Sequence, residues 1–105
     1  MTDRRIGPED AGRTLEVAAG DRLVMALPET AGTGYTWEVE ELPPGARLVE
    51  ERYEHSGEGG IGGASAHVFV VETSQGGNLR LRHGRPWEGE PGVLERYEVT
   101  AKLSS

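Results

Sequence analysis

The chain has 105 residues and a formal net charge of −7, from 18 acidic and 11 basic residues, and it contains no cysteine. A chain of this length forms one domain with one modest core. The missing cysteines exclude disulfides, thiolate metal sites and a cysteine nucleophile, and the acidic balance argues against nucleic acid or an anionic membrane as partner.

Residues 1–13 carry several charges and no strand pattern, so we expect them to form a loose N-terminal arm. After them, 16 glycines and 6 prolines over the whole chain separate short segments in which apolar and polar residues alternate. Such alternation is typical of half-buried strands, and no window shows a helical stripe. The pattern predicts seven strands, over residues 14–17, 22–27, 35–40, 47–54, 64–73, 78–84 and 93–103.

The alternation also predicts which side chains of these strands face the core. The segment "HVFVVE" is apolar on both faces, and we place Phe69 and Val71 inward there. Seven short strands separated by turn signals favour an all-β sandwich, a single domain over residues 14–105. The other predicted inward residues are Leu23, Met25, Leu27, Tyr35, Trp37, Val39, Leu79, Leu81, Tyr97, Val99, Ala101 and Leu103.

If successive strands run in opposite directions, alternate connections lie at the same end of the sandwich. Residues 28–34, 55–63 and 85–92 then share one end; their sequences are "PETAGTG", "HSGEGGIGG" and "RPWEGEPG". These three loops are rich in glycine and carry a tryptophan outside any strand. Because binding residues often lie on loops of a rigid scaffold, we predict that this end is the working surface.

Three motifs that suggest other functions lack the context they need. "GEGGIG" has dinucleotide-binding spacing, but a strand follows it where that site needs a helix. His55, His67 and His83 lack metal-ligand spacing and are expected to be surface or partly buried imidazoles. No G-x-S-x-G elbow accompanies the serines, so we predict no enzyme activity, no metal and no cofactor.

The arginines near the sixth predicted strand have an ordinary structural explanation. Arg80 and Arg82 are expected to pair across strands with acids such as Glu95 and Glu98. Arg85 adjoins the last loop, where it either holds that loop or meets a partner carboxylate.

Trp87 alternates with nothing and stands in a run of glycine, proline and glutamate. Two interpretations stay open. The ring either folds over the end of the sandwich or serves as a binding anchor, the role for which tryptophan is most enriched at interfaces.

Taken together, the three loops resemble those of the chagasin family, inhibitors of papain-like cysteine proteases. The family motifs are N-P-T-T-G-[YF], G-x-G-G and R-P-[WF]. Here the second is "GIGG" and the third "RPW", and the first reads "TAGTGY". The resemblance implies an immunoglobulin-like antiparallel β-sandwich that acts as a monomer, without cofactor, and reversibly occludes a protease cleft with these loops.

The resemblance assigns protease contacts to all three loops. Glycines allow the chain to enter a cleft closely, the tryptophan would bury its ring beside the cleft, and the arginine would position its loop or reach an acid. The implied contact residues are Thr30, Ala31, Gly32, Thr33, Gly34, Tyr35, Gly60, Ile61, Gly62, Gly63, Arg85, Pro86 and Trp87.

The first loop departs from the family motif, because Thr30, Ala31 and Gly32 stand where the family has Asn-Pro-Thr. Without the proline, this loop is expected to be more mobile in the free protein. The departure implies weaker affinity or a different target. It also leaves open a second interpretation, an immunoglobulin-like interaction module that inhibits no protease.

Two features bear on location. No apolar run approaches the length of a membrane span. The N-terminal residues lack the apolar stretch of a secretory signal, which predicts a cytoplasmic protein and leaves secretion open.

Overall fold

The computed structural model describes residues 3–29, 33–55 and 65–104. All seven predicted strands are present in this part of the chain, and one further strand precedes them. The strands are β1 (Asp3–Ile6), β2 (Thr14–Val17), β3 (Arg22–Glu29), β4 (Thr36–Glu41), β5 (Arg47–His55), β6 (Ser65–Glu72), β7 (Gly77–Gly84) and β8 (Val93–Leu103). Three short 3₁₀ helices accompany them, η1 (Pro8–Asp10), η2 (Pro86–Glu88) and η3 (Glu90–Gly92).

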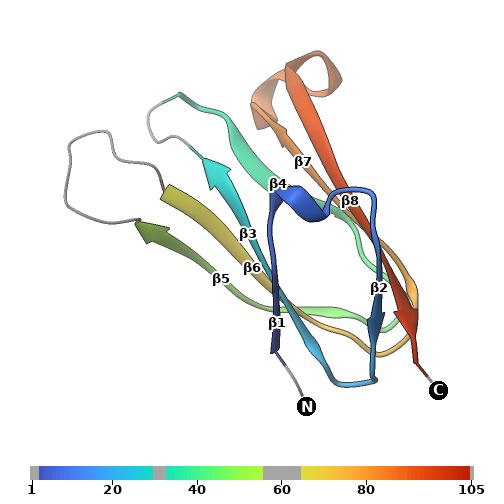
Figure 1. Cartoon of the computed structure of the whole chain (residues 1–105). Coiled ribbons are helices and arrows are strands. Elements are labelled where there is room, and N and C mark those ends of the chain that lie inside the picture. The colour runs from blue at the N-terminus through green and yellow to red at the C-terminus, as the bar shows by residue number, and fades with distance from the viewer. Residues whose placement is uncertain (1–2, 30–32, 56–64, 105) are drawn as a thin grey trace.

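The strands form two four-stranded sheets that pack face to face as a sandwich (Figure 1). One sheet has the order β1-β3-β6-β5 and the other β2-β8-β7-β4. The sandwich prediction is therefore confirmed. Most neighbouring strands are antiparallel, but β1 runs parallel to β3 and β2 parallel to β8 at one edge of each sheet.

Most of the side chains in the core between the sheets are those that the alternation predicted, and Ile6, Leu15 and Val17 join them. Trp37 is 4% exposed, and Phe69 and Val71 also lie in this core. Three predictions are wrong or only partly right. Leu103 is 42% exposed at the last residue of β8, whereas Tyr35 precedes β4 and Val39 packs at the edge of the core, so both are only partly buried.

Residues 3–13 differ from the loose arm that the sequence predicted. Ile6 is buried, and β1 pairs with the outer edge of β3. The hydroxyl of Tyr97 donates a hydrogen bond of 2.8 Å to the carbonyl oxygen of Gly7. The free edge of β3 offers unpaired backbone groups, and β1 satisfies them. A four-residue strand of sequence "DRRI" is too short and too charged for alternation to reveal it.

Charged side chains lie over the outer face of the β1-β3-β6-β5 sheet, above a small apolar cluster that includes Val24 and Val68. Arg5 on β1 reaches Glu54 on β5 across the two strands that lie between them, β3 and β6, at 2.7 Å. Glu54 also pairs with Arg52 at 2.9 Å. These contacts connect the two edges of the sheet.

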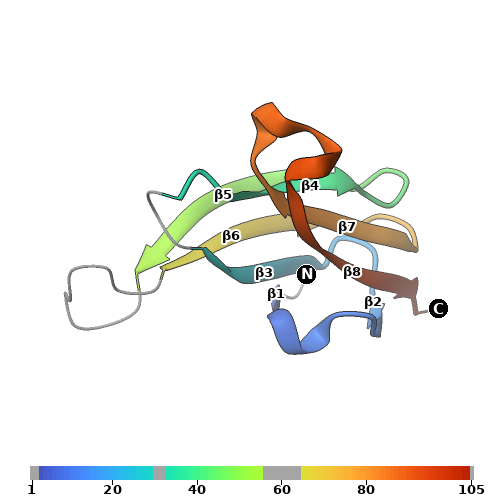
Figure 2. The same cartoon turned by 90° about the horizontal axis from the view of Figure 1, so that it is seen from above.

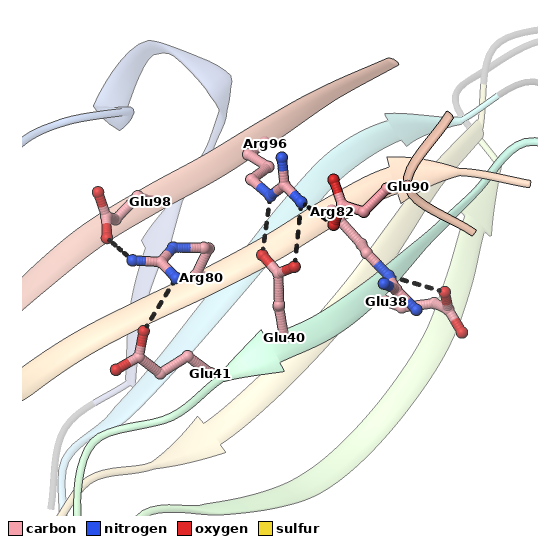
Figure 3. Close-up of polar contacts among 8 residues, drawn as sticks. All are labelled: Glu38, Glu40, Glu41, Arg80, Arg82, Glu90, Arg96 and Glu98. Atoms are coloured by element: carbon pink, nitrogen blue, oxygen red, sulfur yellow. Dashed lines mark hydrogen bonds and ion pairs between the residues drawn. The ribbon is translucent and has the colours of Figure 1, made fainter. Parts of the chain in front are cut away.

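The outer face of the other sheet carries a second network of ion pairs (Figure 3). Arg80 pairs with Glu98 at 3.0 Å, as predicted. Arg82 instead pairs with Glu38 on β4 at 3.3 Å, because its neighbour across β8 is Arg96, another cation. Such exposed pairs contribute little individually, but the contact of 2.6 Å between Arg96 and Glu90 links η3 to β8.

No helix in the described part of the chain has the length and apolar character needed to cross a bilayer.

Candidate functional site

The strand registers bring the bases of the three predicted loops to one end of the sandwich, which we call the loop pole. In one sheet Glu29 pairs with Ser65 and Ser65 pairs with His55, so β3 and β5 end where β6 begins. In the other sheet Thr36 pairs with Gly84, so β4 begins where β7 ends. Figures 1 and 2 show these strand ends on the same side as η2 and η3. The prediction that the three connections share one end is confirmed for their bases.

Not every predicted contact residue can be placed. Thr30, Ala31 and Gly32, together with Gly60, Ile61, Gly62 and Gly63, lie outside the described residues. The structure describes the remaining six, and it brings them together at the loop pole. These are Thr33, Gly34, Tyr35, Arg85, Pro86 and Trp87.

Trp87 lies against Gly34 of the β3–β4 connection. A Cβ atom placed on Gly34 would come within 2.6 Å of Cη2 of the indole. Gly34 has φ +84°, a conformation that side chains other than glycine rarely adopt. The ring is nevertheless 70% exposed. Neither sequence interpretation describes this fully: one edge of the indole rests on the neighbouring loop, and most of the ring faces outward.

Arg85 connects the same two loops. Its guanidinium lies over the ring of Tyr35, 4.3 Å from the centroid, and its Nη1 is 3.3 Å from Glu88. A planar cation over an aromatic face is attracted to the ring electrons. Of the two roles left open for Arg85, the structure supports the one in which it holds its loop.

Aromatic rings continue from Tyr35 into the core. His83 makes an edge contact with Tyr35 at 6.1 Å between centroids and stacks on Trp37 at 4.7 Å. Trp37 then meets Tyr97 edge-on, and its indole N–H donates to the carbonyl oxygen of Pro28 at 2.9 Å. The loop pole is therefore supported from below by a packed column of rings.

Backbone hydrogen bonds make the β7–β8 connection compact. The amide of Glu88 donates to Arg85 at 3.0 Å, and the amide of Gly92 donates to Gly89 at 3.0 Å. A Cβ on Gly92 would lie 2.6 Å from that of Glu88, so only glycine fits. A loop that is ordered before it meets a partner loses less entropy on binding.

A buried acid lies at the base of the β3–β4 connection, and the sequence analysis did not single it out. Glu29 accepts hydrogen bonds from the Trp37 amide at 2.8 Å and from the Thr36 hydroxyl at 3.0 Å. Nδ1 of His67 lies 2.9 Å from the same oxygen. Burial by itself raises the pKa of Glu29, but these bonds and the nearby imidazole lower it more, and the net pKa lies below its ordinary value of 4.5.

His67 is 2% exposed, so the expectation of a surface or partly buried imidazole is wrong for this residue. It shares the inward register of Phe69 and Val71, and Glu29 shares that of Leu27. This two-residue spacing was the signal that could have found the pair. His83 is partly buried, as predicted, and Nδ1 of its ring lies 3.3 Å from Glu95.

The described residues hold no group of three or more histidine or acidic side chains arranged around a common point for a metal ion. What they offer is an exposed indole on a stiff support, beside two connections that leave the same pole. That arrangement suits insertion into a groove of another protein.

Comparison with known proteins agrees with this geometry. Residues 16–101 match the family described as "Chagasin family peptidase inhibitor I42". Chagasin of Trypanosoma cruzi is 30% identical over 100 residues, which cover 89% of this chain and 91% of chagasin.

Two solved structures share the fold at low identity. The cysteine protease inhibitor EhICP2 of Entamoeba histolytica superposes with a TM-score of 0.85, at 18% identity, over 98% of this chain and 96% of that one. PbICP-C, whose structure was solved in complex with falcipain-2, superposes with a TM-score of 0.62, at 16% identity, over 99% of this chain and 100% of that one.

Proposed function

The chain belongs to the chagasin family of peptidase inhibitors, and from that premise we propose that it blocks the active-site cleft of papain-like cysteine proteases with its three pole loops. It is an inhibitor and not an enzyme, since the family consists of peptidase inhibitors. In the proposed complex no covalent bond to the protease is made or broken, so the inhibition is reversible.

The contact between Trp87 and Gly34 is the observation that carries this proposal. It joins the β7–β8 connection to the β3–β4 connection while the indole stays 70% exposed. A large exposed aromatic ring on a preformed support has the properties of an interface anchor. A monomer gains nothing in its own core from a ring held in this way.

Each connection has a separate task in the proposed complex. The β3–β4 connection lies over the catalytic centre, with Thr33 and Gly34 nearest. The β5–β6 connection, with Gly60, Gly62 and Gly63, follows the cleft where side chains would clash. Trp87 buries its ring beside the cleft, and Arg85 stays in the inhibitor as the support of that loop.

Titration of papain and a panel of related proteases with the purified chain tests the proposal. We expect inhibition that is stoichiometric at high protein concentration, reversed by dilution, and accompanied by no cleavage of the inhibitor. A folded chain that inhibits no member of the panel would instead favour the immunoglobulin-like interaction module, for which the altered residues Thr30, Ala31 and Gly32 are the specific support.

A further inference from the structure

His67 lies between two acidic side chains from the strands on either side of it. β6 is flanked by β3 and β5. Nδ1 of His67 is 2.9 Å from Glu29 on β3, and Nε2 is 2.6 Å from Glu51 on β5. One ring can donate a hydrogen bond to each of two carboxylates only as an imidazolium, which has two N–H groups. The geometry is that of one cation shared by two anions.

The surroundings leave the ring little freedom. It is stacked between Tyr53, at 4.3 Å between centroids, and Phe69, at 4.2 Å. Glu29 is buried with it, whereas the Glu51 side chain is 45% exposed. Only Glu51 can therefore turn into water without rearrangement of the core.

Few other groups can influence this charge. Among the described residues, β3 contributes Glu29, and β5 contributes Glu51 and Tyr53. Burial raises the pKa of Tyr53, which keeps its phenol uncharged. From the opposite sheet, β4 contributes Trp37, which is not titratable, and His83 of β7 stacks on Trp37.

Glu29 connects His67 to the loop pole. It is the last residue of β3, and it also accepts hydrogen bonds from Thr36 and Trp37, the first two residues of β4. Its carboxylate thus closes the base of the connection that carries Gly34 and Tyr35. A buried carboxylate keeps its charge only where cations and donors surround it, so the closure depends on His67.

We propose that His67 is a positioning residue for inhibition: by donating to Glu29 and Glu51 at the same time, it fixes the base of the β3–β4 connection relative to β5. Because β5 leads into the connection that contains Gly60 to Gly63, the clamp sets the spacing between the bases of two of the three inhibitory loops. Its effect on inhibition rests on the proposed function, whereas its effect on the free protein rests on the geometry alone.

His67→Phe tests the clamp, because it keeps a flat ring between Tyr53 and Phe69 and removes both donors. We expect inhibition of papain to weaken by about tenfold or more. The matched control is Thr73→Val. Thr73 is equally buried, but its hydroxyl donates to the Asp21 carbonyl oxygen at 2.9 Å, at the far end of the sandwich. That variant loses stability without a change in inhibition.

A spectroscopic test needs no protease. Nitrogen-resolved NMR of the imidazoles is expected to show protons on both ring nitrogens of His67 in the folded protein. The Trp37 amide, which donates to Glu29, should change its chemical shift in His67→Phe, because its acceptor has lost the hydrogen bond from the imidazole.

Three results would overturn the clamp. They are a His67 ring with one unprotonated nitrogen under the conditions of the inhibition assay, a His67→Phe variant that inhibits like the wild type, and a Thr73→Val variant that loses inhibition equally. If the wild type inhibits no protease, the proposed function fails, and the NMR spectrum of the free protein still decides whether the clamp exists.

Discussion

The indole of Trp87 rests on the α-carbon of Gly34, so close that a single methyl group at residue 34 would come within 2.6 Å of the ring. Two loops that are 53 residues apart in the sequence are joined at this point, counting from 34 to 87. The exposed anchor is therefore positioned by the neighbouring loop as well as by its own.

Gly34→Ala is expected to disturb this contact and to weaken inhibition by about tenfold or more, because the methyl group displaces the ring. It also strains a backbone with φ +84°, at a cost of about 1–3 kcal/mol in stability. Gly12→Ala is the matched control, since Gly12 has φ +82° and open space around its Cβ position. Urea unfolding measures the cost of backbone strain in both variants, and the inhibition constants measure the effect of displacing the ring. Equal inhibition by both variants would contradict the role of the contact.

Trp87→Ala is expected to weaken inhibition by about 1–4 kcal/mol, the loss typical of an interface hot spot. The free energy of unfolding should change by no more than about 0.5 kcal/mol, because the ring is mostly exposed. The control is Leu94→Ala, another exposed apolar side chain, 58% accessible and outside the family motifs. A folded Trp87→Ala protein with an unchanged inhibition constant would refute the anchor.

The double substitution Ala31→Pro with Gly32→Thr restores the proline and the threonine of the family motif in the first loop. Proline restricts the unbound loop, so less entropy is lost on binding, and we expect a lower inhibition constant for papain. Each single variant serves as the control for the other. A tenfold loss of inhibition would mean that this loop is adapted to a different target.

Tyr97→Phe tests whether the N-terminal segment is part of the fold. The variant leaves the Gly7 carbonyl oxygen without its donor, and we expect stability to fall by about 1–3 kcal/mol. Thr100→Val is a suitable comparison because it removes an exposed hydrogen bond, from the Thr100 hydroxyl to Asn78 at 3.1 Å. Calorimetry provides the measurement, and a loss no larger than that of Thr100→Val would count against the assignment.

Glu54→Gln is expected to show pH-dependent destabilisation. Hydrogen bonds from Arg5 and then from Arg52 lower the pKa of Glu54 to about 2, from an ordinary 4.5. A lowered pKa in the folded state stabilises the protein above pH 4.5, and that contribution is lost as the pH falls towards 2. The difference in unfolding midpoint between wild type and variant should therefore vanish near pH 2 and shrink in high salt. A difference that is constant with pH would exclude the ion pair as its cause.

Much of the fold follows from the sequence, because burial of one face of each strand imposes a two-residue period. That period located seven strands and placed residues such as Leu23, Phe69 and Val99 in the core. The alternation of connections between successive antiparallel strands then placed three loops at one end, and "RPW" and "GIGG" indicated the family. These are local or alternating patterns, and each is written along the chain in order.

The tertiary structure decided what depends on partners distant in sequence. The parallel pairing of β1 with β3, the choice of Glu38 by Arg82, the contact of Trp87 with Gly34 and the clamp around His67 all join separate segments. The sequence around a charged residue or a glycine does not indicate which distant residue it will contact. The partner is determined only when the sheets pack and the strand register brings particular atoms into contact.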